Sequence, residues 1–333
     1  MSLFSSYCKI EESIGFDTSD RSAEKALKQV RQWVVTEKVH GANFSFIYST
    51  ASSEIRYAKR NGMLSPEDRF FQYQTILPEV EPKIQALCQH LHNNQHLLSK
   101  SIKTKLGSSP IETIIIYGEL FGGLYPHEQV PAHPFTPIQK GIYYSPDIHF
   151  MAFDIKLNQT HFFDYEEARN LFQQFEIFHA EPLAIFPTYS KAVEYPLGFD
   201  STIPRRLGLP PLPTDNKAEG IVVRSSSRHF LTKVKIPEFH EGHSQAAVYA
   251  NNSMTLTELQ SIAMRMILNE NRLNSAISKI GSLDDYRYQI FEEMIEDVYR
   301  ELRISKDYPH RKGLRSSLLQ QLKIQFPEPD ENI

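Results

Sequence analysis

The sequence predicts an α+β fold in which antiparallel sheets with flanking helices are followed by a small all-helical C-terminal domain. Over the first 240 residues, strand-like and helix-like runs mix without the regular alternation that a parallel sheet requires. Beyond residue 255 the strand-like runs end and apolar residues recur at helical spacing. We therefore expect a mixed domain over residues 1–240, a polar linker over 241–254 and a helical domain over 255–333.

The β-rich runs of the mixed domain are short and are separated by polar and proline-bearing segments. Residues 33–48 are interrupted by His40-Gly41-Ala42-Asn43, which predicts a strand, a tight turn and a second strand. The other predicted strands cover residues 114–117, 149–155, 220–224 and 230–236. Predicted helices cover residues 22–31, 76–92 and 165–175, and surface loops are expected at 97–110 and 204–213.

The C-terminal region predicts three helical stretches. The first begins near Thr255 or Thr257, either of which can cap it, and ends at Gly281. The other two cover residues 284–303 and 312–324. These amphipathic helices carry cations that suit a clamp on a duplex backbone, where phosphate contacts give affinity without reading sequence: Arg272, Lys279, Arg311 and Lys312.

Length and composition limit the classes of protein that fit. The 333 residues, 41% of them hydrophobic, can bury the cores of two domains. A net charge of -4 argues against general attraction to a polyanion, so any nucleic-acid contact must be local. The two cysteines, Cys8 and Cys88, form no metal-ligand pattern. Without a signal-like start or a long apolar run, we expect a cytoplasmic protein with no membrane partner.

The segment KVHG places Lys38 three residues before Gly41, between two predicted strands. A lysine at a strand end can project into a pocket, and glycine lets the backbone turn tightly beside a bulky ligand. The same short pattern also occurs in hairpins with an exposed lysine. Further motifs follow over roughly two hundred residues, namely AKRNG (58–62), YGELFGG (117–123), FMAFDI (150–155), EGIVVR (219–224) and LTKVK (231–235).

This ordered set resembles the motifs of the covalent nucleotidyltransferases, the superfamily of ATP-dependent DNA ligases, RNA ligases and mRNA capping enzymes. The resemblance implies a nucleotidyltransferase (ATP-grasp-like ligase) domain. DNA ligases and capping enzymes usually carry aspartate where this chain has His40. EKVHGANFSF (37–46) is similar instead to the nick-sealing RNA ligases of T-even phages and the trypanosome RNA-editing ligases, and NRLNSAISKIG (271–281) is similar to the helical tail of the phage-type ligase.

The resemblance implies that Lys38 is the nucleophile that takes AMP from ATP. A lysine attacks phosphorus only as the neutral amine, which neighbouring cations such as Lys233, Lys235 and a bound magnesium or manganese ion would favour. The same cations would neutralise the charge that builds on the phosphate. Without Lys38, the i, i+2 spacing of Lys233 and Lys235 would equally fit two charges on an edge strand.

The other candidate residues also take their roles from the resemblance. Glu219 is expected to hold the metal and Glu119 to contact the ribose. Phe153 is expected to stack on adenine, although a phenylalanine in a strand is most often core. The remaining expected nucleotide contacts are Glu37 through its backbone, Asn43 near the phosphates or metal, and Arg60 at the sugar or the bound end.

The function implied is an ATP-dependent RNA ligase. It would join a 3′-hydroxyl to a 5′-phosphate through lysine–AMP and AMP–RNA intermediates, acting as a monomer on RNA, with nicked duplex as the expected substrate. A DNA ligase or an mRNA guanylyltransferase of the same superfamily is one alternative, against which His40 and the helical tail speak. A catalytically inactive RNA-binding protein with the same fold is another, although every expected reactive position is filled.

Overall fold

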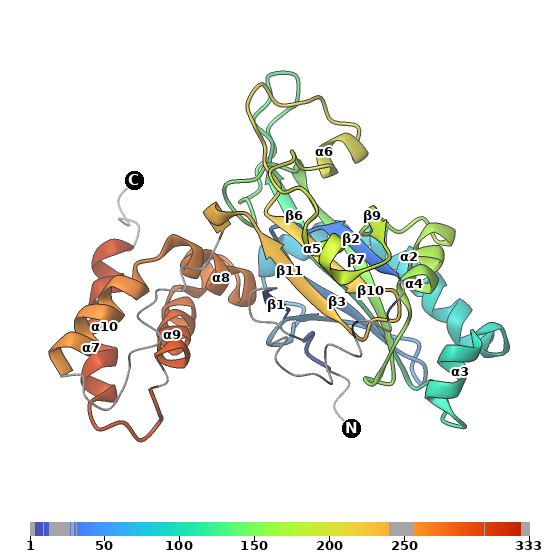
Figure 1. Ribbon diagram of the computed structural model, residues 1–333, viewed down its shortest axis with the longest axis horizontal. Coiled ribbons are helices and arrows are strands. Elements are labelled where there is room, and N and C mark those ends of the chain that lie inside the picture. Colours follow the sequence, from blue (N-terminus) through green and yellow to red (C-terminus); the bar gives the residue numbers. More distant parts are fainter. Residues whose placement is uncertain are drawn as a thin grey trace. The chain divides into compact units, whose positions relative to one another are not determined.

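A computed structural model of the chain describes residues 4–8, 10–12, 27, 30, 32–239, 256–302 and 304–327. The chain divides into two compact units, Met1–Ile236 and Pro237–Ile333 (Figure 1). The first mixes helices with two mainly antiparallel sheets, and the second contains helices in its described part, so the predicted α+β class with a helical C-terminal segment is confirmed. The predicted linker and nearly all of the predicted helix at 22–31 lie outside the described residues.

A five-stranded sheet forms one half of the first unit. Its spatial order is β1 (Glu11–Glu12), β11 (Leu231–Lys235), β10 (Gly220–Ser225), β2 (Trp33–Glu37) and β9 (Pro182–Phe186). The short β1 pairs in parallel with β11, and the other pairs are antiparallel. Trp33, Val35, Ile221 and Val223 alternate along their strands and bury one face of this sheet against Ala192 of α5 (Tyr189–Val193).

A six-stranded antiparallel sheet forms the other half. Its order is β5 (Gly62–Met63), β4 (Ile55–Lys59), β3 (Ala42–Ser49), β6 (Thr113–Leu124), β7 (Ser145–Leu157) and β8 (His161–Phe162). The two sheets meet through an apolar cluster in which Leu231 of β11 packs with Ile115 and Tyr117 of β6. Since β6 and β7 are the longest strands of the sheet, the predicted runs at 114–117 and 149–155 underestimated both.

The predicted turn after Glu37 joins strands of different sheets rather than forming a hairpin. β2 belongs to the five-stranded sheet and β3 to the six-stranded sheet. Gly41 makes the crossing possible, because a Cβ atom there would lie 2.1 Å from the carbonyl oxygen of Leu120. Lys38, at the start of this crossing, therefore lies where the two sheets meet.

Helices cover the strands, and two segments that were predicted to be loops contain helical residues. A 3-10 segment, η2 (Phe70–Ile76), leads into α2 (Leu77–Asn93), which lies where a helix was expected, as does α4 (Tyr165–Gln174). Residues 97–110 are not simply a loop. They begin at the last residue of η3 (Gln95–Leu97) and contain α3 (Lys100–Leu106), which Ser99 caps by accepting a hydrogen bond from the Ile102 amide. Similarly, the expected loop 204–213 begins inside α6 (Ile203–Arg206).

The described part of the second unit begins with η4 (Pro237–Phe239) and continues with α7 (Leu256–Ile267), α8 (Glu270–Ile280), α9 (Leu283–Glu301) and α10 (Arg311–Gln325). The stretch predicted to run unbroken to Gly281 is divided at Asn269, whose side chain accepts hydrogen bonds from the first amides of α8. Ile267, Ile290 and Leu318 pack the core of the four helices. Among the described helices, none combines the length and apolarity that crossing a membrane requires.

Three of the four cations proposed for a duplex clamp form ion pairs with carboxylates of this same unit. Arg272 is 4% exposed and forms ion pairs with Asp297 and Glu301. Lys279 pairs with Glu293 at 2.8 Å, and Arg311 pairs with Glu296 at 2.6 Å. Arg272 is therefore a structural residue, which corrects the expectation that it binds phosphate. Of the four, Lys312 alone is exposed with no ion pair in the described part of the unit.

Arg272 and Arg300 both pair with Asp297, but Arg272 is buried and Arg300 is exposed. Replacing each should therefore destabilise the helical unit by a different amount. Replacing Arg272 with methionine leaves two partly buried carboxylates without their cation and should destabilise the helical unit by about 3 kcal/mol. Arg300 is 57% exposed, so Arg300→Met should cost less than about 1 kcal/mol. Urea unfolding followed by far-ultraviolet circular dichroism measures both, and equal losses would contradict the structural role of Arg272.

Candidate active site

Lys38 lies just after β2 and is held by a buried carboxylate. Its Nζ donates to Oε2 of Glu219 at 2.6 Å, and the Lys38 amide donates to the carbonyl oxygen of Gly220 at 3.0 Å. Lys235, at the end of β11, approaches Oε1 of Glu219 at 3.1 Å. The Glu219 side chain is 2% exposed. Three residues from distant parts of the sequence thus form one ion cluster.

The charge of Glu219 is set by this cluster. Burial alone would raise the pKa of Glu219, but Lys38, His40 and Lys235 outweigh that effect and hold the pKa well below its usual range. The backbone fixes the position of the carboxylate, since Gly220 has φ +149° and a Cβ atom there would lie 2.0 Å from the carbonyl oxygen of Val234. Glu219 is therefore a fixed anion between two lysines.

His40 also binds Glu219. Its Nδ1 lies 3.2 Å from the same Oε2 that Lys38 contacts. The His40 amide donates to the hydroxyl oxygen of Tyr144 at 2.9 Å, and burial raises the pKa of Tyr144 well above its ordinary value, so the phenol stays protonated. Tyr144, which the sequence did not single out, thus fixes the turn that carries Lys38.

Glu119 and Asn43 lie side by side on neighbouring strands, because Asn43 of β3 is in register with Glu119 of β6. Burial raises the pKa of Glu119 to about 7, while the cations Lys38 and Arg60 oppose that rise and Glu219 adds to it. Asn43 is buried and donates weakly to the Gly118 carbonyl oxygen at 3.4 Å. Glu119 therefore lies within electrostatic reach of Lys38, Arg60 and Glu219.

Phe153 of β7 is half-buried in a group of aromatic rings where the sheets meet. Its ring centroid lies 4.9 Å from that of Tyr7, which in turn lies 5.0 Å from Tyr117. The N-terminal segment 4–8, which contains Tyr7, is held to the sheet by a hydrogen bond that Ser6 donates to the carbonyl oxygen of Arg60 at 2.8 Å. The sequence prediction overlooked this segment because it carries no motif of its own.

Beneath Phe153, Asp154 forms a fully buried charge cluster. Its carboxylate pairs with Arg224 at 2.5 Å and Arg228 at 2.8 Å, and it accepts a hydrogen bond from the Tyr7 hydroxyl at 2.5 Å. Burial would raise the pKa of Asp154, but the two arginines lower it below its ordinary value. Arg224 belongs to β10 of one sheet and Asp154 to β7 of the other, so the cluster joins the two sheets below the aromatic group.

The remaining predicted contacts differ in their surroundings. The Glu37 side chain accepts hydrogen bonds from Ser201 and Thr202, which leaves its backbone for any contact with adenine. Lys233 shares a strand face with Lys235 and Leu231, since Thr232 and Val234 alternate to the other side. Lys233 therefore faces the space between the sheets, on the same side as the Glu219 cluster.

The carboxylates of Glu119 and Glu219 fit a divalent cation of the magnesium type. Such ions keep several waters and are held by one or two carboxylates together with substrate phosphates, rather than by a full protein cage. Within the described residues, no three His, Cys, Asp or Glu side chains gather as a metal site. Glu219 adds to the raised pKa of Glu119, so the two carboxylates influence each other electrostatically.

Comparisons with known proteins agree with these motifs. A sequence model described as RNA ligase matches residues 31–235. The mitochondrial RNA-editing ligase 2 of Trypanosoma brucei brucei is 31% identical over 339 residues, covering 84% of this chain and 77% of that protein. The mitochondrial RNA-editing ligase 1 of the same organism is 29% identical over 254 residues, and the match covers 68% of this chain and 51%, about half, of that relative.

A solved structure of a Naegleria gruberi RNA ligase mutant with ATP and Mn is also similar. It is 14% identical, with a TM-score of 0.46, and the match covers 72% of this chain and 58% of that chain.

The raised pKa of Glu119 predicts a pH-dependent difference in stability. A carboxyl with a folded pKa of about 7 and an unfolded value near 4.5 stabilises the fold below the unfolded value and loses that contribution as pH rises through 7. Glu119→Gln cannot ionise, so its stability relative to wild type should increase by roughly 3 kcal/mol between about pH 5 and about pH 8. Thermal unfolding at both pH values measures this. Glu54→Gln, at an exposed carboxylate, should show no such change.

Proposed function

The chain belongs to the RNA ligase family, a family of ATP-dependent enzymes, and from this premise we propose that it joins RNA ends through AMP bound covalently to Lys38. One observation carries the proposal. The amine of Lys38 lies 2.6 Å from a buried carboxylate, with a second lysine on the other oxygen of that carboxylate. A surface lysine in a hairpin would have no such surroundings.

We propose three linked steps. The neutral Lys38 amine attacks the α-phosphorus of ATP, forming a phosphorus–nitrogen bond as pyrophosphate leaves. The RNA 5′-phosphate then attacks the same phosphorus, so that AMP passes to the RNA and Lys38 is released. Finally the RNA 3′-hydroxyl attacks the activated phosphate, forming the phosphodiester bond as AMP leaves and the hydroxyl proton is lost.

The ion cluster has two parts in the first step. Glu219 orients the Lys38 amine through their 2.6 Å contact. Lys235 contacts the other oxygen of the same carboxylate, so Glu219 is shared between two lysines. A divalent cation held by Glu219 would neutralise phosphate charge when bound. Lys233 and Lys235, on one face of β11, support the α-phosphate as negative charge builds on it.

The adenosine moiety is proposed to lie between the sheets, over the aromatic group. Phe153 would stack on adenine, with Tyr7 holding the ring from behind. Arg60 and Glu119 would contact the ribose, and Asn43 would lie near the phosphates or the metal. Asp154 is proposed as the residue that positions Phe153, because its buried ion pairs join the two strands beneath it.

For the substrate, we propose RNA with a 3′-hydroxyl and a 5′-phosphate, held as a nick in a duplex. The names of the two trypanosome relatives, RNA-editing ligases, support RNA as the substrate. The resemblance of EKVHGANFSF to nick-sealing ligases supports the duplex. A sealing assay on nicked duplexes with RNA or DNA on each side of the break tests this, and we expect sealing when both sides are RNA. Faster joining of unpaired single strands would contradict the duplex preference.

The covalent step predicts loss of labelling when the amine is removed. Wild-type protein incubated with α-labelled ATP and magnesium or manganese should acquire protein-bound AMP that survives denaturing electrophoresis, and Lys38→Ala should acquire none. Lys217→Ala removes an exposed lysine that pairs with Asp200 and should label as wild type. Labelled Lys38→Ala protein would remove the mechanism. A wild type that stays unlabelled with either metal would favour the inactive RNA-binding alternative.

A further inference from the structure

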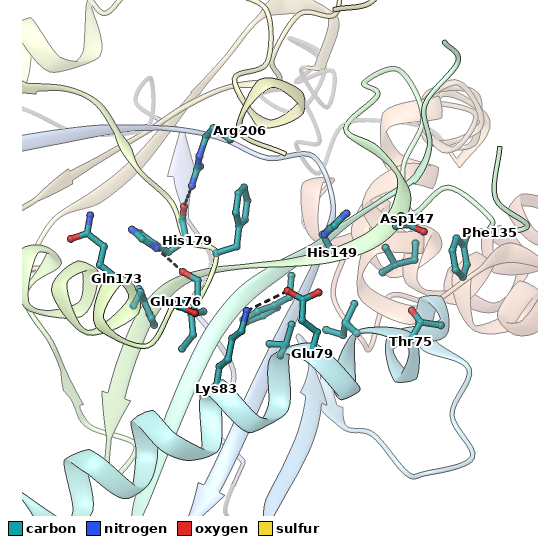
Figure 2. Close-up of a pocket in the computed structure, with 17 residues that line it drawn as sticks. Thr75, Glu79, Lys83, Phe135, Asp147, His149, Gln173, Glu176, His179 and Arg206 are labelled. Carbon is teal, nitrogen blue, oxygen red and sulfur yellow. Dashed lines mark hydrogen bonds and ion pairs between the residues drawn. The ribbon is translucent and has the colours of Figure 1, made fainter. Parts of the chain in front are cut away.

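A cavity of about 530 Å³ opens in the first unit between α2, the first half of β7 and the segment that follows α4. Figure 2 shows Glu79 and Lys83 on α2 below it, with Arg206 and His179 toward one end and Phe135 and Asp147 toward the other. None of the described residues that line it belongs to the Lys38 cluster. Its volume lies in the range of sites that enclose small organic groups.

Flat side chains supply much of the cavity wall. The guanidinium of Arg206 lies over the ring of Phe178, with its central carbon 4.2 Å from the ring centroid, and donates to the His179 carbonyl oxygen at 2.7 Å. His149 is stacked on Phe121 at 5.6 Å, and burial lowers the pKa of His149, so its imidazole is uncharged near neutral pH. Rings and guanidinium planes are the surfaces on which unstacked nucleobases bind.

The charges of the cavity favour a base over a phosphate. Three carboxylates line it, those of Glu79, Asp147 and Glu176, against the cations of Lys83 and Arg206. Lys83 is already paired with Glu79 at 3.3 Å. A phosphate would meet net negative charge here, whereas the amino groups of a nucleobase would find acceptors. The occupant that fits is a neutral, flat ring bearing N–H donors.

Two chains of contacts join this cavity to the residues beside Lys38. Glu37 accepts hydrogen bonds from Ser201 and Thr202, at the start of α6, the helix that carries Arg206. On the other side, three aromatic rings lead from the cavity to the turn after Lys38. Phe178 lies 6.1 Å from Phe121, which lies 5.5 Å from Tyr144, whose hydroxyl accepts from the His40 amide.

We propose that this cavity binds an unpaired nucleobase of the RNA substrate, next to the break, while the ends to be joined lie at Lys38. The proposal rests on the proposed ligase function and adds a second contact for RNA. The guanidinium of Arg206, supported from behind by the ring of Phe178, forms the stacking platform, and Glu176 accepts hydrogen bonds from the base edge. The enzyme would thereby favour breaks flanked by an unpaired nucleotide over fully paired nicks.

The test uses the full chain and a nicked RNA duplex with one unpaired 2-aminopurine beside the break. Binding to wild type should quench the fluorescence of that base by stacking. Phe178→Leu, which removes the ring but keeps an apolar side chain, should weaken binding of this RNA about tenfold, within the usual effect of one stacked base. Phe175→Leu, a half-buried phenylalanine outside the cavity, serves as the matched control and should bind as wild type.

Further readouts separate the cavity from the ligase reaction. Lys38 labelling and sealing of fully paired nicks should be unchanged in Phe178→Leu; if labelling is lost, Phe135→Leu replaces it as the test variant. Unchanged binding and quenching in the variant that still labels would overturn the proposal. A second result would also overturn it. If free adenosine, added at the concentration at which the RNA binds, reverses the fluorescence quench of the 2-aminopurine, the cavity is a site for free nucleosides.

Discussion

The first unit depends on one buried carboxylate. Glu219 lies at the start of β10 with almost no exposure, and an isolated charge there would cost several kcal/mol. It remains ionised because Lys38, His40 and Lys235 surround it. Lys38 and His40 come from the first motif and Lys235 from the last, so the ion cluster requires that the crossing after β2 and the end of β11 meet at one point. The arrangement that stabilises the carboxylate therefore also assembles the proposed nucleophile.

A second buried carboxylate fastens the two sheets together beneath the aromatic group. Asp154 joins β7 to Arg224 of β10 and to Arg228 in the turn that follows, while Tyr7 adds a hydrogen bond from the N-terminal segment. Removing one partner from such a cluster leaves an uncompensated charge, which is far more costly than losing a surface pair. This rigidity suits a site where Phe153 must be held in a fixed orientation.

Much of the fold class could be predicted from the sequence because it depends on local signals, whereas the motif cluster was implied by the family resemblance. Alternating β-rich runs predicted β10 and β11, and the ordered motifs suggested that Lys38, Glu219 and Lys235 belong to one site. The missing features depend on tertiary contacts. Tyr7 and Tyr144 act through partners more than a hundred positions away, and no periodicity marks them. In the sequence Arg272 has the pattern of a surface cation, and only the fold shows that it is buried between Asp297 and Glu301.

The central claim is that the amine held by Glu219 is the one that bonds to phosphorus. The most direct measurement is proteolysis of the protein after incubation with ATP and a divalent cation, followed by mass spectrometry of the peptides. The account predicts a single AMP adduct on the peptide that contains Lys38, with fragmentation placing it on that side chain. An adduct on Lys59, Lys233 or Lys235, with Lys38 unmodified, would contradict it.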